Sequence, residues 1–183
     1  MVHIFLAQGF EEIEAIATID ILRKSGLKVN IVGIGGNFIS GNVGVKVEAD
    51  ILDKELKDFS GISSIVIPGG YGGAKRLLKS KLVLDAIRYC NEKGGVIGAI
   101  CAGPSVLAKA GILKNKSITC YPGIESWIED SSVKVTGKAV EKDGKIITAI
   151  GPGATLEFAY TLVSEILNNK ASEELKKAMC YEN

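Results

Sequence analysis

Short apolar runs alternate with amphipathic stretches along the whole chain. Runs rich in Val and Ile predict strands at Val2–Ala7, Lys28–Ile34, Ser63–Ile67, Val96–Ile100 and Ser117–Cys120. Apolar residues that recur at helical spacing predict helices over Glu11–Lys24, Leu82–Lys93, Ser105–Ala110, Thr155–Leu167 and Glu173–Met179. This alternation is typical of an α/β fold in which helices cover both faces of a mostly parallel sheet.

Three segments depart from the simple alternation. Val133–Val140 and Lys145–Ala149 flank Asp143-Gly144, a dipeptide that favours a tight turn, so they predict a small β-hairpin. Val43–Val47 alternates only weakly and predicts a strand at the margin of the sheet. Gly33-Ile-Gly-Gly36 is similar to a dinucleotide-binding loop, but it lacks the third glycine and no helix follows, so we interpret it as a turn.

The length and composition indicate one domain. A chain of 183 residues, 46% hydrophobic and 23% charged, can form a single folded unit over residues 1–183. Its net charge of +1 gives no support for binding to nucleic acid or to an anionic membrane surface. The first apolar run breaks at Gln8-Gly9, too early for a signal peptide, and no run approaches the roughly eighteen residues of a membrane span. We therefore expect a cytoplasmic protein without membrane binding.

The use of cysteine and histidine argues against disulfides and metal binding. The four cysteines, Cys90, Cys101, Cys120 and Cys180, include no CxxC pair, and in a reducing compartment we expect them to remain unpaired. His3 is the only histidine, so a Cys/His zinc site would lack ligands. Because the chain also has no P-loop, we expect neither a metal nor a cofactor.

Cys101 is the strongest candidate for chemistry. It follows the apolar run Val96–Ile100 directly and has small residues on both sides, which is typical of a nucleophile elbow, a strained turn that holds the side chain at the end of a sheet. The helix that starts at Pro104 points its N-terminus at the sulfur and favours the thiolate. We predict that Cys101 is the only strongly acidic thiol of the four cysteines; lowering a thiol pKa to roughly 5.5, for example, takes more than a helix N-terminus supplies, so a second partner is needed.

The alternative is that Cys101 is a small buried core residue, as free cysteines usually are. Its small neighbours and Pro104 favour the nucleophile. For the other three cysteines, the interpretation as ordinary structural residues is favoured over that of a nucleophile. Cys90 fits the buried side of a helix and Cys180 lies near the end of the chain, whereas Cys120 ends a predicted strand and stays ambiguous.

Two further segments are expected to meet Cys101 at the carboxyl edge of the sheet. Pro68-Gly-Gly-Tyr-Gly-Gly73 follows a strand, and its glycines would let backbone N–H groups approach a ligand, although an ordinary flexible loop is equally compatible. Glu11 and Glu12 are explained as acidic residues of a first helical turn. Glu14 lies deeper in that helix, beside apolar residues, so it could face Cys101.

Together these motifs resemble those of the ThiJ/PfpI superfamily, most closely its parkinsonism-associated deglycase branch. The resemblance rests on Gln8-Gly-Phe-Glu-Glu-Ile-Glu14, Pro68-Gly-Gly70, Ala99-Ile-Cys-Ala-Gly-Pro104 and Gly151-Pro-Gly153, in this order. It extends from the first strand to the last helix. It implies a flavodoxin-like three-layer sandwich and a homodimer.

The resemblance also implies roles for individual residues. Cys101 would be the nucleophile, with Glu14 as a largely protonated carboxylic acid hydrogen-bonded to its sulfur. The backbone N–H groups of Gly70 and Ala102 would form the oxyanion hole. The rest of the pocket would include Gly69, Cys120, Tyr121 and Gly153.

One position departs from that branch, because Tyr121 stands where a histidine is often found. His3 cannot replace it, since about five residues of strand, roughly 17 Å, separate His3 from the active edge near Gly9. A Cys-His-Glu glutaminase triad is therefore excluded, and a papain-like peptidase is disfavoured.

Three functions are compatible with these residues. The resemblance implies first a glutathione-independent glyoxalase or deglycase, in which the Cys101 thiolate adds to a small aldehyde or glycated substrate and Glu14 moves protons. The second is a redox-sensing, chaperone-like stress protein in which Cys101 is oxidised to a sulfinate. The third is a hydrolase or peptidase, which the missing histidine disfavours.

Overall fold

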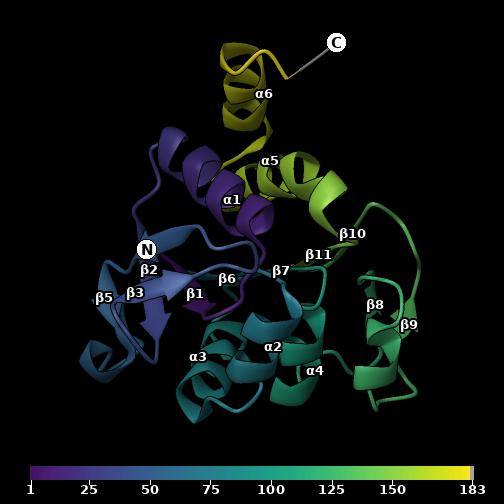
Figure 1. The fold of residues 1–183 in the computed structure, drawn as a ribbon. Coiled ribbons are helices and arrows are strands. Elements are labelled where there is room, and N and C mark those ends of the chain that lie inside the picture. The colour runs from purple at the N-terminus through teal and green to yellow at the C-terminus, as the bar shows by residue number, and fades with distance from the viewer. Residues whose placement is uncertain (182–183) are drawn as a thin grey trace.

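A seven-stranded sheet lies at the centre of the computed structural model, which describes residues 1–181 (Figure 1). In spatial order its strands are β10 (Val140–Asp143), β11 (Ile146–Ala149), β7 (Val96–Ile100), β6 (Ser64–Ile67), β1 (Val2–Ala7), β2 (Val29–Ile34) and β5 (Ile51–Leu52). Every neighbouring pair is parallel except the β10–β11 hairpin. The predicted mostly parallel sheet with a small hairpin is therefore confirmed, and the hairpin forms one edge of the sheet. The bounds Val133–Val140 predicted for its first strand were wrong, because the residues directly before the turn, Val140–Asp143, pair with Ile146–Ala149, whereas Lys134–Val135 pairs with Ser117–Ile118.

The three central strands are buried on both faces, as their near-continuous apolar sequences predict. Every residue of β1, β6 and β7 is buried. The register pairs Ile4 with Val66 and Ile67 with Ala99, so the three strands run in the same direction side by side. The chain segments that follow these strands therefore meet at one edge of the sheet.

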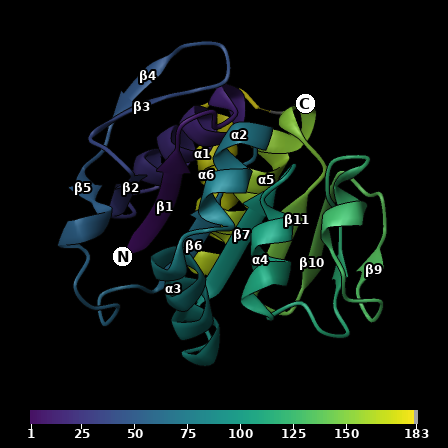
Figure 2. The ribbon, with the colours of Figure 1, turned by 60° about the horizontal axis from the view of Figure 1, so that its bottom comes forward.

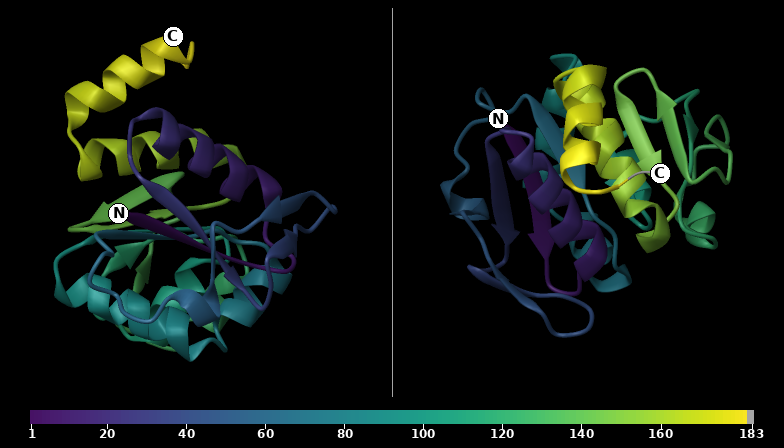
Figure 3. Two further views of the ribbon diagram at one scale, coloured as in Figure 1. Left: turned by 90° about the vertical axis from the view of Figure 1, so that its left-hand side faces the viewer. Right: turned by 90° about the horizontal axis from the view of Figure 1, so that it is seen from above.

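Helices cover both faces of the sheet (Figures 1 and 3). One face carries α1 (Glu12–Lys24), α5 (Thr155–Ile166) and α6 (Asn169–Ala178), and the other carries α2 (Tyr71–Leu77), α3 (Lys81–Glu92) and α4 (Pro104–Ala110). Gly98 lets α5 approach β7, because a Cβ there would lie 2.8 Å from Leu162 Cδ2 and 2.9 Å from Phe158 Cζ. Helix α6 packs on the outer side of α5, where the Ser172 hydroxyl donates to the Tyr160 carbonyl. No helix within residues 1–181 is long and apolar enough to cross a membrane.

Two short two-stranded sheets lie outside the main sheet. They pair β3 (Phe38–Ser40) with β4 (Lys46–Glu48), and β8 (Ser117–Ile118) with β9 (Lys134–Val135). The remaining turns are the 3-10 segments η1 (Asp53–Glu55), η2 (Ile124–Trp127) and η3 (Pro152–Ala154). The strand predicted at Val43–Val47 was wrong in position, since β4 begins at Lys46 and pairs with β3 instead of the main sheet.

Two other local predictions were wrong. The glycine-rich segment after β6 is not a loop throughout, because α2 begins at Tyr71. Helix propensity opposes Gly73 inside a helix, but a Cβ on it would lie 3.0 Å from Phe10 Cα, so the glycine permits close packing. The strand predicted over Ser117–Cys120 ends at Ile118, because the next N–H group, that of Thr119, donates to a side chain instead of a neighbouring strand.

Candidate active site

Cys101 occupies a strained turn between β7 and α4. Its backbone φ of +62° lies in the left-handed region, which residues other than glycine rarely adopt and which costs about 1–2 kcal/mol. Two hydrogen bonds hold the turn: the Cys101 N–H donates to the Ala149 carbonyl at 2.9 Å, and the Cys101 carbonyl accepts from the Tyr121 N–H at 3.0 Å. The strained strand-to-helix turn that the small neighbours of Cys101 predict is therefore present.

Glycines keep space free around this turn. A Cβ on Gly69 would lie 2.6 Å from both the Cys101 Cβ and Glu14 Oε2, which is closer than real side chains approach. A Cβ on Gly103 would lie 2.3 Å from the Ile67 carbonyl oxygen. These contacts give a physical reason for the small residues that flank the cysteine in the sequence.

Glu14 lies beside Cys101, as its position in α1 predicts. Its side chain is fully buried, and Oε2 accepts a hydrogen bond from the Gly69 N–H at 2.7 Å. The carboxyl group also interacts with the Cys101 thiol. Oε1 has no partner of ordinary hydrogen-bond geometry within residues 1–181, so this oxygen remains available to the sulfur or to a ligand.

The environment of Glu14 favours its protonated form. Burial raises the pKa of Glu14 to about 7, and the hydrogen bond from the Gly69 N–H opposes this shift only in part. A carboxyl group with this pKa is about half protonated at neutral pH. Glu14 can therefore act both as a donor and as an acceptor of protons near neutral pH.

The thiol of Cys101 differs from the sequence prediction. Burial and, second, the negative charge of Glu14 raise the pKa of Cys101 to about 12, although the N–H groups of Gly70 and Ala102 act in the opposite direction. A thiol that is strongly acidic by itself was therefore a wrong prediction. The reason is that burial and a neighbouring carboxylate outweigh two N–H donors, that of Ala102 just before α4 and that of Gly70 in the turn after β6.

Cys101 and Glu14 titrate as a pair. Because each charge opposes the other, the pair gives up one proton near neutral pH and holds the second much more strongly. When Glu14 keeps that second proton, its repulsion is absent and its O–H can donate to the sulfur. Thiolate character at Cys101 thus depends on Glu14 being protonated.

The two N–H groups predicted as an oxyanion hole lie next to the sulfur. Those of Gly70 and Ala102 both interact with Cys101. Gly70 has a φ of +88°, and a Cβ on it would lie 2.4 Å from the Gly9 carbonyl oxygen and 2.6 Å from the Glu11 nitrogen. Only glycine fits this position, so the turn after β6 delivers a backbone donor where no side chain can intervene.

Tyr121 and Cys120 lie on the segment that pairs with the Cys101 carbonyl. Tyr121 is 42% exposed, and its ring lies against Gly151, whose Cβ position is 3.2 Å from Tyr121 Cδ2. Cys120 is buried beside it. The position of a Cβ on Gly153 has no atom of residues 1–181 within 4 Å, so Gly153 borders open space.

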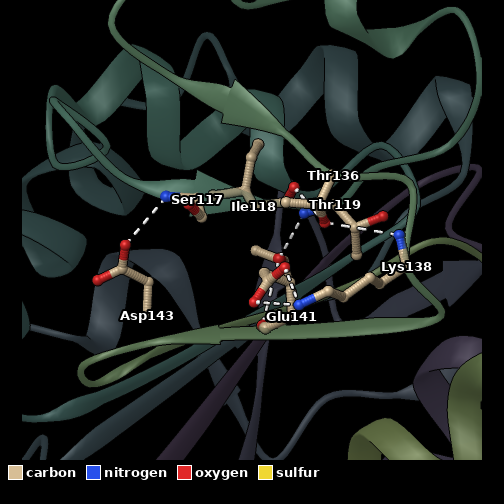
Figure 4. Close-up of polar contacts among 8 residues, drawn as sticks. Ser117, Ile118, Thr119, Thr136, Lys138, Glu141 and Asp143 are labelled. Carbon is tan, nitrogen blue, oxygen red and sulfur yellow. Dashed lines mark hydrogen bonds and ion pairs between the residues drawn. The ribbon is translucent and has the colours of Figure 1, made fainter.

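Thr148, which the sequence does not mark as a functional residue, fixes this segment. Its hydroxyl oxygen accepts the Thr119 N–H at 2.8 Å, just before Cys120. Figure 4 shows Thr119 at the end of β8, where the Ser117 N–H donates to the Asp143 carboxylate at 2.9 Å. Thr148 is the single polar residue of the buried, otherwise apolar strand β11, so no sequence signal distinguishes it from a core residue.

The histidine and the other three cysteines do not provide a second reactive group at the Cys101 site. His3 is buried near the start of β1, far from its active end, so it cannot serve as a base for Cys101. Burial raises the pKa of Cys90 to about 11 and that of Cys120 to about 12. Cys180 is exposed. No group of three or more potential ligands within residues 1–181 could hold a metal ion.

The fold and this geometry define a class of protein: an open α/β sandwich with a buried cysteine–carboxylic acid pair at the carboxyl edge of its sheet. The sequence matches the DJ-1/PfpI family over residues 1–165. This chain belongs to the DJ-1/PfpI family, which confirms the predicted superfamily.

Three relatives illustrate the match. Protein dj-1beta of Drosophila melanogaster is 36% identical over 177 residues, which cover 96% of this chain and 94% of that protein. The crystal structure of Drosophila melanogaster DJ-1beta has a TM-score of 0.91 and 34% identity, and the match covers 100% of this chain and 98% of that chain. Glutathione-independent glyoxalase DJR-1.2 of Caenorhabditis elegans is 32% identical over 170 residues, covering 93% and 90%. The structure of oxidized Toxoplasma gondii DJ-1 has a TM-score of 0.90 and 29% identity, covering 100% and 98%. The flavodoxin-like α/β fold is thereby confirmed.

Proposed function

We propose that this protein is a cysteine-dependent enzyme for small carbonyl compounds, of the glutathione-independent glyoxalase or deglycase type. The observation that carries the proposal is the buried pair of Cys101 and Glu14, with the N–H groups of Gly70 and Ala102 against the sulfur. The Caenorhabditis elegans relative that is named a glutathione-independent glyoxalase supports this class of reaction.

The first step would use the form of the pair in which Cys101 carries the negative charge and Glu14 the proton. The sulfur attacks the aldehyde carbon of a 2-oxoaldehyde such as methylglyoxal, and an S–C bond forms. The carbonyl oxygen takes the proton from Glu14, which gives a hemithioacetal. The N–H groups of Gly70 and Ala102 would stabilise the charge on that oxygen before the proton arrives.

The second stage would move a hydrogen between the two former carbonyl carbons. Ionised Glu14 removes the hydrogen of the attacked carbon as a proton and returns it to the neighbouring carbon, while the hydroxyl proton of the hemithioacetal moves to the oxygen of that neighbouring carbon. One carbon is oxidised and the other reduced, so no external oxidant or reductant is needed. Water then cleaves the S–C bond of the resulting thioester, releasing the 2-hydroxy acid and restoring Cys101.

The test is lactate formation from methylglyoxal without glutathione. We expect the wild-type protein to produce lactate and Cys101→Ala to produce none above the uncatalysed rate. Cys180→Ala is the matched control, because this cysteine is exposed and outside the site, and it should keep the wild-type rate. Equal lactate formation by Cys101→Ala would overturn the proposal.

A second candidate function is redox sensing at Cys101. The related Toxoplasma gondii structure is of an oxidized form, and in this chain protonated Glu14 and two N–H groups surround the sulfur. Each peroxide molecule would transfer one oxygen to the thiolate and leave as water, so two molecules produce a sulfinate that these donors can bind. Mass spectrometry after mild peroxide should find two added oxygens on the Cys101 peptide. A dominant Cys101–Cys120 disulfide would contradict this function and mark Cys120 as a resolving thiol.

We also propose that the protein forms a homodimer through α1 and the β3–β4 sheet. Ile13 and Ile16 of α1, together with Phe38, Val43 and Val45, are large apolar side chains left exposed, Val43 to 78%. Their exposure supports a partner surface. The molar mass from light scattering should be that of a dimer, and Ile13→Asp should lower it to that of one chain. A wild-type monomer at micromolar concentration would contradict this proposal.

A further inference from the structure

A second cleft lies away from Cys101, between α2, α4 and η2. Its volume is about 740 Å³, within the range of roughly 300–1,000 Å³ that is typical of small-molecule sites. Figure 2 shows α2 and α4 together on the sheet face that lies opposite α1. None of the residues of the cysteine site lines this cleft.

Three positively charged lysines line the cleft. Lys75 lies on α2, Lys79 lies in the turn just after that helix, and Lys109 lies on α4. None of the three forms an ion pair with a carboxylate within residues 1–181. Their ammonium groups are therefore available to an anionic ligand.

Two carboxylates also line the cleft, and they do not cancel this charge. Glu129 and Asp130 oppose three lysines, so the lining has one net positive charge. Asp130 is already engaged, because its Oδ1 accepts both the N–H of Ser132 at 2.9 Å and its hydroxyl at 2.7 Å. An anionic group placed beside the lysines would thus meet an excess of unpaired cations.

Apolar and aromatic side chains form another part of the lining. Leu78, Ala108 and the half-buried Trp127 contribute to it. The Trp127 ring is fixed by the edge of Tyr71, at 5.4 Å between ring centroids and 82° between planes. Lys75 Nζ lies 5.4 Å from the centroid of the same ring, so a cation and an aromatic wall occur side by side.

We propose that this cleft binds a small molecule in which an aromatic ring is joined to an anionic group, as in a nucleoside monophosphate. The ring would pack against Trp127 and Leu78, and the anionic group would lie among Lys75, Lys79 and Lys109. The apolar wall alone would suit a neutral ring, and the lysines alone would suit a free anion. Their combination in one cleft selects a ligand that carries both parts.

The sequence offers a direct probe, because Trp127 is the only tryptophan of the chain. Adenosine monophosphate, adenosine and inorganic phosphate would each be titrated into the full-length protein while Trp127 fluorescence is followed. We expect a saturable change with the monophosphate and at least tenfold weaker binding of adenosine and of phosphate. No saturable change with the monophosphate would overturn the proposal, and phosphate binding as tight as the monophosphate would do the same.

Lysine variants locate the binding. Lys79→Gln and Lys109→Gln should each weaken binding of the monophosphate about two- to fivefold, the usual size of an exposed charge pair. Lys57→Gln is the matched control, because Lys57 is exposed and outside the cleft, and it should bind as the wild type does. Unchanged affinity in both cleft variants would overturn the proposal. No turnover is measured, so the outcome is independent of the proposed cysteine chemistry.

Discussion

The carboxyl group of Glu14, from the first turn of α1, lies beside the thiol of Cys101, which follows β7; β6 alone separates β7 from β1, the strand that leads into α1. The Gly69 N–H holds Glu14 Oε2 at 2.7 Å, while Oε1 has no ordinary hydrogen-bond partner within residues 1–181. One oxygen is therefore fixed and the other is free to exchange a proton with the sulfur. Two acidic groups in one buried site make the protonation of each depend on the other.

Replacing Glu14 by Gln should abolish turnover without unfolding the protein. An amide of the same shape still accepts the Gly69 N–H through its oxygen, but it cannot carry a proton between two carbons. We expect lactate formation to fall at least about a hundredfold. Glu11→Gln, in the same βα turn, should keep more than half of the rate. A Glu14→Gln variant with near wild-type turnover would mean that another group carries the proton.

The raised pKa of Glu14 predicts how stability changes with pH. The pKa is about 7 in the folded protein, against an ordinary value of 4.5. Below pH 4.5 both states are protonated and the protein has its full stability with respect to this group. As the pH rises to 7 only the unfolded state gives up its proton, so the free energy of unfolding decreases, by up to about 3 kcal/mol.

The comparison of the wild type with Glu14→Gln isolates this effect. Denaturant unfolding of both proteins between about pH 4 and pH 8 should show the wild type losing stability relative to the variant as the pH rises. Burial lowers the pKa of His3 and so adds its own pH dependence, but His3 is present in both proteins and cancels in the difference. Parallel stability curves would show that Glu14 does not retain its proton in the fold.

Gly69→Ala should damage both the fold and the site. Its Cβ would lie 2.6 Å from the Cys101 Cβ and from Glu14 Oε2, so one of these groups must move. We expect a loss of about 1–3 kcal/mol in the free energy of unfolding, as for other overpacked sites, and no detectable turnover. Gly153→Ala is the control, because no atom of residues 1–181 lies within 4 Å of its Cβ position. Equal stability of the two variants would contradict the crowded geometry.

Thr148→Val should loosen the segment that carries Cys120. The substitution removes the acceptor of the buried Thr119 N–H, which should cost about 1–3 kcal/mol in the free energy of unfolding. We expect Cys120 to react faster with a thiol reagent, while Cys90 in α3 is unchanged. Thr148→Ser keeps the hydroxyl and should restore the protection of Cys120. Slow labelling of Cys120 in Thr148→Val would show that the hydroxyl is not needed for its position.

The sequence predicts the sheet and the cysteine turn because both depend on local patterns. Runs composed mostly of apolar residues mark β1, β6 and β7, and small residues around Cys101 mark a turn with little space. The position of Glu14 also follows from helical spacing. These features need no knowledge of which segments meet in space.

What the sequence does not predict depends on contacts between distant segments. The glycines of helix α2 are explained only by their close contact with the turn after β1. Thr148 accepts a hydrogen bond from Thr119, which belongs to another part of the chain. The pKa of Cys101 is the clearest case. Its helix N-terminus is visible in the sequence, whereas the depth of burial and the charge of Glu14 depend on the folded structure.

Substitutions of Tyr121 test whether a second side chain, besides Glu14, takes part in the proton transfers. Its N–H donates to the Cys101 carbonyl, and its ring lies against Gly151, but its hydroxyl makes no hydrogen bond within residues 1–181. Phenols are poor bases near neutral pH. Tyr121→Phe keeps the backbone bond and the ring, so we expect lactate formation to change by less than about threefold. Tyr121→Ala removes the wall of the pocket and should raise KM more than it lowers kcat. A large loss of kcat in Tyr121→Phe, with Glu14→Gln still active, would transfer the proton-carrying role from Glu14 to Tyr121.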